Sequence, residues 1–435
     1  MEQPVTPPAS DNAAQPQQFS TPRTARPFAR RRVRLVAGAA GLLVGALALT
    51  ACGGDAKAND DGKGGQSGKG ADASAAKDAS TLKITISAKD GSTNASINDV
   101  TVTAEGGKLS DVTMTEAQGG KAVPGTLAAD GLSWKPTGKV ERGTQYKIAA
   151  NGKDDKGRAA TENSQFTTVS AKDSFIGTYT PDDGSTVGVG MPVSFNFNKA
   201  ITNKKDVLSH ITVTSSSGQQ VVGHWFNSQR LDFRPEQYWK AGSKVTMKID
   251  LDKVEGAKGV YGVQKKNVTF TIGRNQVSTV DVKTQEMTVQ QDGKTVKTIP
   301  VSTGSAEHPT YNGQMVISEK FTQTRMNGDS VGFGGEYDIK DVPHAMRLST
   351  SGTFIHGNYW GDPSVFGNEG TSHGCVGMRD VKGAAGDTSA KWMFDHSIIG
   401  DVVVVKGSPD KTISPDNGLN GWNLSWAQWT ADSAS

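Results

Sequence analysis

Short runs of alternating apolar and polar residues recur along the chain from about Leu82. The first series comprises LKITIS, DVTVTA, YKIAA and QFTTV, and a second series between about Ser174 and Gly273 comprises VSFNFN, ITVTSS, VTMKID and VTFTIG. Gly, Asp and Asn separate many of these runs, and Thr and Val are frequent within them. A period of two between turn residues is typical of β-strands. The pattern therefore predicts a mostly β protein.

The two series share a longer pattern, which indicates an internal repeat. LSWKPTGKVERGTQYKI in the first corresponds to LDFRPEQYWKAGSKVTMKI in the second, with Trp134 and Phe233 at equivalent places. A repeat of about 100 residues with about seven short strands has the size of an immunoglobulin-like sandwich. We therefore predict two tandem immunoglobulin-like domains, 81–170 and 171–273. We expect the following aromatic residues to fill their cores, the alternative being a carbohydrate-binding face: Trp134, Trp225, Phe226 and Trp239.

A third β region, 274–408, opens with a predicted hairpin. In QEMTVQQDGKTVKTIPVSTG, Asp292 and Gly293 supply the turn between two strands. The apolar positions assigned to these strands are Met287, Val289, Val296, Ile299 and Val301. Further along, AKWMFDHSII predicts a short helix and DVVVVKG a strand. This region is expected to be a mainly β catalytic domain.

The C-terminal segment 409–435 is polar except for three tryptophans. Trp422, Trp426 and Trp429 lie within eight residues of one another. Indole rings bury a large apolar surface, so we expect this segment to pack back onto the catalytic region or a sandwich.

The first 51 residues predict a signal peptide. Arg30, Arg31, Arg32 and Arg34 precede an apolar stretch from Leu35 to Leu49 that is too short and too rich in Gly and Ala to span a membrane comfortably. Leu49-Thr50-Ala51-Cys52 resembles the bacterial lipobox, in which the cysteine becomes the lipidated first residue of the mature protein. An ordinary signal peptide with a chance cysteine is the alternative, and the arginines leave Sec and twin-arginine export open. The Gly- and Asp-rich stretch 52–80 predicts a flexible linker.

The charge of the chain gives no indication of a nucleic-acid partner. The whole sequence has a formal net charge of +3, but residues 1–51 contain six arginines against Glu2 and Asp11, a net +4. The remainder therefore carries 3 − 4 = −1, and the basicity belongs to the signal peptide.

Cys375, in TSHGCVGMRD, is the candidate nucleophile. The chain has two cysteines, and if Cys52 carries lipid, no partner remains for a disulfide in this exported protein. A nucleophilic thiol needs an imidazole nearby. His373 is near because residues two apart share a face of an extended segment, whereas His356 follows an apolar run and can reach across from a neighbouring strand.

The surroundings of this cysteine favour acyl transfer through a thioester. The carbonyl of Gly357, next to His356, can accept the second ring N–H of the imidazole and fix its tautomer. Gly374 allows close approach of a substrate, and its N–H together with that of Cys375 could bind an oxyanion.

His356 followed by Ser372-His373-Gly374-Cys375-Val376 resembles the signature of the L,D-transpeptidase (YkuD) catalytic domain. The whole layout resembles actinobacterial lipoprotein members with two immunoglobulin-like domains and a Trp-rich C-terminal segment. The resemblance implies Cys375 as nucleophile, His356 as base and Gly357 as the residue whose carbonyl orients it. The residues expected to bind substrate or assist the oxyanion are Gly374, Tyr337, Met326, Trp360, Ser372, His373 and Thr371.

One position departs from this family. Two residues after the nucleophile the family usually has Asn or Arg, and this chain has Gly377. Arg379 could stand in from nearby, or an orienting hydrogen bond is lost.

The resemblance implies a peptidoglycan L,D-transpeptidase that forms 3–3 cross-links, with release of a terminal D-Ala, between a tetrapeptide donor and a diamino-acid acceptor. It implies no cofactor, a monomer, and an extracytoplasmic location with a lipid anchor in the cell membrane. The alternatives are a cell-wall cysteine hydrolase, in which water resolves the thioester, and a non-catalytic wall-binding lipoprotein. A zinc site of His356, His373 and Cys375 lacks an obvious fourth ligand, and no metal site is predicted. The remaining histidines have no motif context and are expected to be surface or core residues: His210, His224, His308, His344 and His396.

Overall fold

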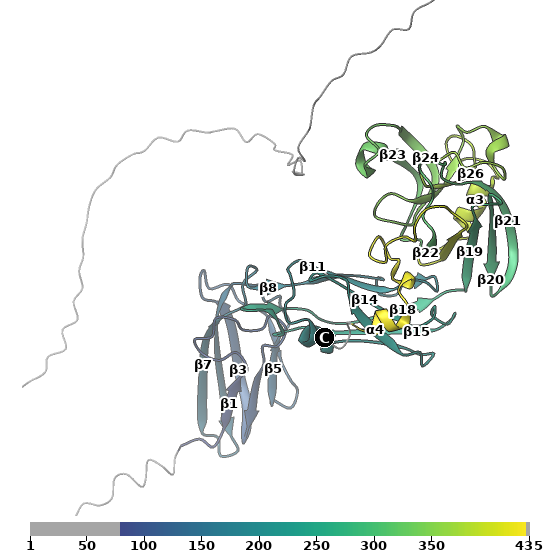
Figure 1. Cartoon of the computed structure of the whole chain (residues 1–435). Coiled ribbons are helices and arrows are strands. Elements are labelled where there is room, and N and C mark those ends of the chain that lie inside the picture. Colours follow the sequence, from purple (N-terminus) through teal and green to yellow (C-terminus); the bar gives the residue numbers. More distant parts are fainter. Residues whose placement is uncertain (1–78, 432–435) are drawn as a thin grey trace, which may run out of the picture. The chain divides into compact units, whose positions relative to one another are not determined.

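The computed structural model describes residues 79–431 (Figure 1). The predicted signal peptide, the lipidation at Cys52 and nearly all of the predicted linker lie outside the described residues. The described part of the chain forms three successive groups of β-sheets, each with a large hydrophobic cluster, which confirms the mostly β prediction. Between residues 79 and 431, no helix has both the length and the apolar character needed to cross a membrane.

The first sandwich packs two antiparallel sheets around one core. The sheets have the orders β1-β2-β5-β4 and β3-β6-β7. Their strands are β1 (Lys83–Ile86), β2 (Val102–Glu105), β3 (Gly107–Glu116), β4 (Gly125–Leu127), β5 (Ser133–Pro136), β6 (Gln145–Asp154) and β7 (Ala159–Thr167). Trp134, from one sheet, and Tyr146, from the other, are buried in this core. A side chain on Gly125 would meet the Trp134 ring at 1.9 Å, so glycine lets the indole lie flat against its neighbouring strand.

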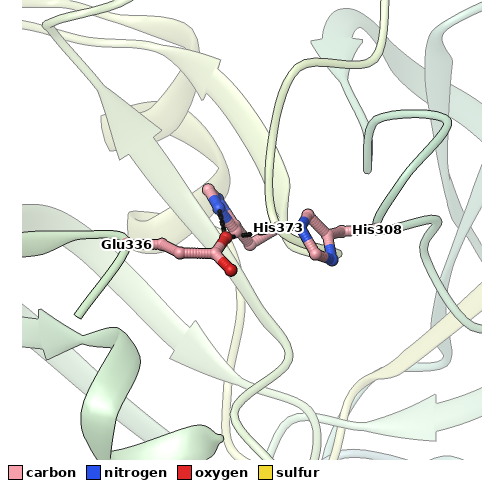
Figure 2. Close-up of side chains that lie close together, drawn as sticks. All are labelled: His308, Glu336 and His373. Atoms are coloured by element: carbon pink, nitrogen blue, oxygen red, sulfur yellow. Dashed lines mark hydrogen bonds and ion pairs between the residues drawn. The ribbon is translucent and has the colours of Figure 1, made fainter. Parts of the chain in front are cut away.

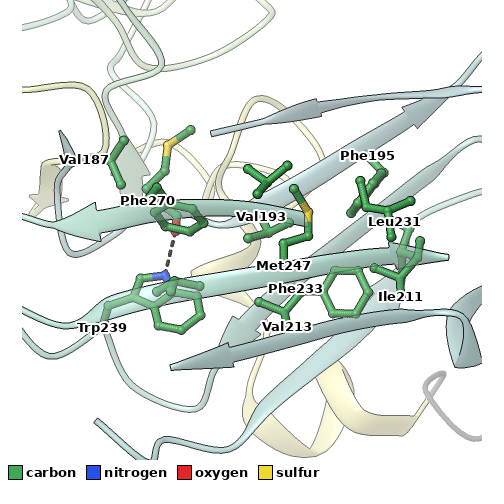
Figure 3. Close-up of a cluster of buried hydrophobic side chains, with 14 of the residues drawn as sticks. Val187, Val193, Phe195, Ile211, Val213, Leu231, Phe233, Trp239, Met247 and Phe270 are labelled. Atoms are coloured by element: carbon green, nitrogen blue, oxygen red, sulfur yellow. Dashed lines mark hydrogen bonds between the residues drawn. The ribbon is translucent and has the colours of Figure 1, made fainter. Parts of the chain in front are cut away.

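The second sandwich has two four-stranded sheets, β10-β18-β15-β12 and β13-β14-β11-β9, and a small sheet β16-β17-β8. Its elements are β8 (Ser174–Phe175), β9 (Gly177–Thr180), β10 (Thr186–Val187), β11 (Val193–Phe197), α2 (Lys204–Ser209), β12 (Ile211–Ser215), β13 (Val221–Trp225), β14 (Arg230–Pro235), β15 (Lys244–Asp250), β16 (Glu255–Ala257), β17 (Val260–Gly262) and β18 (Lys265–Ile272). Figure 3 shows its core, in which Trp239 donates its indole N–H to the carbonyl of Met191 at 2.7 Å.

The aromatic residues assigned to the sandwich cores are mostly where the sequence predicted them. Trp134, Trp225 and Trp239 are buried, whereas Phe226 is half-buried. The core prediction is therefore confirmed for the three tryptophans.

The third domain is built on a nine-stranded sheet of order β22-β27-β19-β20-β21-β26-β25-β24-β23. Its elements are β19 (Gln276–Asp281), β20 (Glu286–Gln291), β21 (Lys294–Ser302), β22 (Gly313–Val316), β23 (Glu319–Asn327), η1 (Gly328–Val331), β24 (Asp338–Arg347), β25 (Phe354–Asn358), η2 (Pro363–Val365), β26 (Val376–Arg379), α3 (Ser389–Asp395) and β27 (Val402–Lys406). The pairs β19–β27 and β25–β26 are parallel. The predicted helix and the DVVVVKG strand correspond to α3 and β27.

The predicted hairpin is formed by β20 and β21, and a bulge interrupts its second strand. Asp292 and Gly293 have φ of 49° and 76°, the left-handed pair that a two-residue turn matching the strand twist requires. The register shifts after Val289, so Val296 is the extra residue of a bulge and is 44% exposed. Val296 lies in the second strand as predicted, but the bulge disrupts the alternation of side chains and leaves it facing solvent.

The C-terminal segment packs back as predicted, and it contacts the second sandwich. It contains η3 (Gly421–Asn423) and α4 (Trp426–Ala431). Trp422 and Trp429 are buried, and their indole N–H groups donate to the carbonyls of Gly190 (2.7 Å) and Val222 (2.9 Å). The buried guanidinium of Arg234 lies 4.8, 5.5 and 4.3 Å from the ring centres of Trp422, Trp426 and Trp429.

Candidate active site

A crevice in the third domain brings together most of the residues that the sequence singled out. Strand β25 carries His356, and the parallel strand β26 begins directly after Cys375. The hairpin of β23 and β24 contributes the opposite wall. The predicted residues that line the crevice are Cys375, His356, Tyr337, Met326, Trp360, Thr371, Ser372 and His373. The crevice is also lined by residues that the sequence did not single out: Ile339, Asn358, Gly361, Asp362 and Val365.

Cys375 is buried at the bottom of this arrangement. Its side chain belongs to a small apolar cluster with Val342, Ala345 and Phe354, and its thiol donates to the carbonyl of Gly352 at a sulfur–oxygen distance of 3.6 Å. Burial raises the pKa of the thiol to about 11. At neutral pH the sulfur is therefore protonated, and a base would have to remove the proton for this sulfur to act as a nucleophile.

His356 is the buried imidazole of the crevice. Its Nδ1 lies 2.9 Å from the carbonyl oxygen of Gly357. A carbonyl oxygen can only accept, so Nδ1 carries the hydrogen and Nε2 the lone pair. Burial lowers the pKa of His356, against the opposing effects of the Gly357 hydrogen bond and of Asp380. The ring, which stacks on Trp360 at 5.7 Å, is thus a neutral imidazole with a basic Nε2.

A second histidine and an aspartate, which the sequence did not indicate, lie behind Gly357. His344 Nδ1 lies 2.7 Å from Asp380 Oδ2, and both residues are buried. The other carboxylate oxygen accepts from the Thr388 hydroxyl (2.9 Å) and the Val381 amide (2.8 Å). A Cβ on Gly357 would lie 1.9 Å from Asp380 Oδ2. Asp380 was visible at the end of the cysteine motif, but nothing in the sequence paired it with His344.

The loop before Cys375 is held to the end of β21. The hydroxyls of Thr371 and Ser302 are 2.9 Å apart, and the Ser372 hydroxyl donates to the carbonyl of Cys375 at 2.6 Å. Gly374 has φ of 98° and donates its N–H to the Ser372 hydroxyl at 3.2 Å. Gly374 also lines a neighbouring cavity rather than the crevice. This geometry does not favour the expected part of its N–H in an oxyanion site.

The segment that joins β23 to β24, residues 328–337, which we call the lid loop, contributes Tyr337 to the opposite wall. Tyr337 ends this loop and lines the crevice, and its ring centre is 5.0 Å from that of His373. Burial raises the pKa of Tyr337 to about 12. Its hydroxyl is therefore neutral at physiological pH and can donate a hydrogen bond into the crevice.

Gly377 lies in the interior of the sheet, next to the amide side chain of Asn358. Gly377 pairs with His356 of β25 and with Ser302 of β21. Arg379 is exposed and is not among the described residues that line the crevice, so the suggestion that it replaces a side chain at 377 is not supported. Asn358 does line the crevice, and its Nδ2 would be 3.7 Å from a Cβ on Gly377.

Two protein-family models match the chain, and the first match spans parts of both sandwiches. Residues 92–255 match the family described as bacterial Ig domain, and residues 275–405 match the family described as L,D-transpeptidase catalytic domain. L,D-transpeptidase 2 of Mycobacterium tuberculosis is 31% identical over 356 residues, which are 81% of this chain and 85% of that protein. L,D-transpeptidase 5 of the same species is 27% identical over 78% of this chain and 74% of its own length.

Solved structures of L,D-transpeptidases match about half of the chain. An L,D-transpeptidase from Mycobacterium smegmatis has a TM-score of 0.41 at 22% identity and covers 53% of this chain and 97% of its own. L,D-transpeptidase 3 from Mycobacterium tuberculosis, in complex with a faropenem-derived adduct, has a TM-score of 0.43 at 24% identity with the same coverage.

Proposed function

The chain belongs to the L,D-transpeptidase family, and from that premise we propose that it cross-links peptidoglycan stem peptides by acyl transfer through Cys375. The observation that carries the proposal is that one crevice holds both the thiol of Cys375 and a neutral imidazole, His356, whose Nδ1 is engaged by the Gly357 carbonyl. A nucleophile and a base oriented by a third group are the elements of covalent acyl transfer.

In the first half-reaction, Sγ of Cys375 attacks the carbonyl carbon of the amide between the third residue of a tetrapeptide stem, a diamino acid, and its terminal D-Ala. The thiol proton passes to Nε2 of His356. The C–N bond then breaks, and His356 delivers this proton to the nitrogen of the departing D-Ala. The stem remains attached to the enzyme as a thioester.

In the second half-reaction, the neutral side-chain amine of the third residue of another stem attacks the thioester carbon. His356 accepts a proton from this amine and returns it to the departing sulfur. The product is a 3–3 cross-link, and Cys375 is a free thiol again. Both tetrahedral intermediates carry an oxyanion, for which we assign the Tyr337 hydroxyl and the Cys375 amide as donors.

Substrate positioning is assigned to residues of the crevice walls. Met326 and Trp360 provide apolar surface on either side of the donor stem. We assign the hydrogen bond that the family usually provides at position 377 to Asn358. Its Oδ1 accepts from the backbone amides of Trp360 (3.1 Å) and Gly361 (2.8 Å), so its contribution to a substrate is the NH₂ group.

The acyl-enzyme is tested by mass spectrometry of the intact protein after incubation with a carbapenem. One covalent adduct is expected on the wild type and none on Cys375→Ala. His356→Ala should abolish acylation, His373→Ala should only slow it through the geometry of the loop, and His210→Ala, which removes a half-buried histidine of the second sandwich far along the chain from the crevice residues, is the matched control. A folded wild-type protein without an adduct, or wild-type acylation in His356→Ala, would overturn the assignment.

The second half-reaction needs a separate assay with a tetrapeptide donor and a diamino-acid acceptor. Release of D-Ala together with a cross-linked dimer is the expected result. Release of D-Ala together with free tripeptide and no dimer would indicate that water resolves the thioester, and the enzyme would then be a hydrolase.

We also propose, from the sequence, that Cys52 carries a lipid that anchors the enzyme to the membrane. Each buried CH₂ of an acyl chain contributes roughly 0.8 kcal/mol to membrane binding. Cys52→Ala should therefore move the protein out of the membrane fraction or leave it unprocessed. Incorporation of a radioactive fatty acid that persists in Cys52→Ala would contradict this assignment.

A further inference from the structure

Three side chains with metal-binding groups meet beside the crevice, outside the reacting pair. His308 comes from the segment between β21 and β22, Glu336 from the lid loop, and His373 from the loop before Cys375 (Figure 2). Glu336 Oε2 lies 2.8 Å from His373 Nε2 and 3.3 Å from His308 Nε2. Each of the three can offer a ligand atom within 4.8 Å of the others. No sequence motif contains His308, and no sequence pattern indicated a role for Glu336.

The arrangement is close to what a zinc ion requires. Zinc lies about 2.0–2.2 Å from nitrogen and oxygen ligands, so two ligands of a tetrahedral site are about 3.4 Å apart. The two ligand distances that involve Glu336 are 2.8 and 3.3 Å, so small side-chain movements would open space for the ion. The imidazole rings now lie nearly parallel, with centres 4.8 Å apart, and have to rotate for both nitrogens to point at one ion.

The surroundings hold these groups together without closing them off from solvent. The ring of Phe333 packs edge-on against both imidazoles, at 5.0 Å from His308 and 5.4 Å from His373. The side chains of His308, Glu336 and His373 remain 28%, 48% and 31% exposed. An ion can therefore enter from solvent, and a water molecule can complete the coordination.

We propose that His308, Glu336 and His373 bind a divalent transition-metal ion of the Zn²⁺ type. Two imidazoles and a carboxylate suit this class of ion, whereas Ca²⁺ and Mg²⁺ prefer ligands that are all oxygen. The site is distinct from a cluster of His356, His373 and Cys375, because it shares only His373 with that cluster and leaves the thiol free.

A metal ion bound at this site links the lid loop to the loop before Cys375. Glu336 precedes Tyr337, which forms one wall of the crevice, and His373 is two residues before Cys375. An ion that links the two restricts the opening through which a stem peptide reaches the thiol. This consequence rests on the proposed function, whereas metal binding does not.

Binding is tested by calorimetric titration of Zn²⁺ into the full chain carrying Cys52→Ala and Cys375→Ala, which removes both thiols. One ion per chain is expected. His308→Ala and Glu336→Gln should each weaken binding by at least about tenfold, and His396→Ala, an exposed histidine elsewhere in the same domain, should not. No binding to the thiol-free protein, or equal binding to His308→Ala, overturns the proposal. This protein is catalytically inactive by design, so the result is independent of whether transpeptidation is the correct function.

The link to the lid loop is tested with both thiols restored. Saturating Zn²⁺ should slow carbapenem acylation of the wild type by at least about threefold, and it should leave His308→Ala at its metal-free rate. Equal slowing in both proteins would show that zinc acts on the thiol itself and would overturn the lid-loop assignment. A chelator should restore the wild-type rate.

Discussion

Gly357→Ala tests whether the buried Asp380 keeps the imidazole of His356, the proposed base, in place. The added Cβ would lie 1.9 Å from Asp380 Oδ2 and 2.6 Å from its Cβ and Cγ. An ordinary contact needs about 3.5 Å, so the carboxylate has to move by roughly 1.5 Å. That movement breaks or bends the 2.7 Å hydrogen bond to His344. Overpacking costs about 1–3 kcal/mol and loss of one partner of a buried pair about 3–5 kcal/mol, so a partly relaxed variant should lose about 2–4 kcal/mol of unfolding free energy.

Acylation should fall as well, because the carbonyl that the substitution displaces is the one that orients His356. A misplacement of about 1 Å near the reacting groups can cost up to about a hundredfold in rate. We expect the variant to react with a carbapenem at least about tenfold, and up to about a hundredfold, more slowly than the wild type. The reaction is followed through the intact mass of the protein, at a urea concentration at which both proteins are folded. Urea unfolding gives the stability change.

Gly377→Ala is the matched control, because it adds the same methyl group to the neighbouring strand. Its nearest contact would be the Ser302 carbonyl oxygen at 3.4 Å, so both stability and acylation should change little. The double variant Gly357→Ala/Asp380→Ala should lose less unfolding free energy than the two single variants lose in sum, since Asp380→Ala removes the clashing carboxylate. If Gly357→Ala behaves like Gly377→Ala, Asp380 does not constrain the position of His356.

Three further predictions concern the thiol, the amide and the C-terminal segment. Because burial raises the pKa of Cys375 to about 11, alkylation by a small neutral reagent should accelerate about tenfold per pH unit from pH 7 to 10; a plateau at neutral pH would indicate a stable thiolate. Asn358→Ala should slow turnover of a tetrapeptide donor by a few-fold to about tenfold without affecting alkylation, and Gly377→Asn should restore it. Arg234→Met should lower the unfolding free energy by about 2 kcal/mol through loss of the cation–π contacts and of the 2.9 Å hydrogen bond to the Leu424 carbonyl; unchanged urea unfolding would contradict this.

The structural features predicted correctly from the sequence are those that depend on residues close together in the chain. Alternation identified β20 and β21, and the Asp292-Gly293 turn followed from the need for two left-handed residues. The tryptophans of the sandwiches and of the C-terminal segment were expected to be buried because indole surface is costly to expose. The bulge at Val296 was missed, because its cause is the pairing with β20 and not a feature of its own strand.

Cys375, His356 and Gly357 were identified from the cysteine motif and the histidine upstream of it, whereas no pattern in the sequence paired His344 with Asp380, which lie behind Gly357. His344 is 36 residues from Asp380 in the sequence and meets it only because β24, β25 and β26 are neighbours in the sheet. Glu336 and His308 are also distant in the sequence, and their contact depends on the paths of the two loops that carry them. Such pairings are fixed by tertiary packing, and residue type alone gives no signal for them.

A neutral, buried thiol has a chemical advantage for an enzyme of this kind. Thiolate character and exposure govern how easily a cysteine is oxidised, and both are low at Cys375, which is 8% exposed with a pKa raised to about 11. In the proposed mechanism, reaction then depends on a substrate that enters the crevice and places its carbonyl carbon where Sγ can attack while His356 removes the proton. The pKa shifts of Cys375 and His356 act together, because the lowered pKa of His356 keeps its imidazole neutral and able to accept that proton. Selectivity for a correctly placed acyl donor therefore follows from burial of the pair and does not require an unusually reactive sulfur.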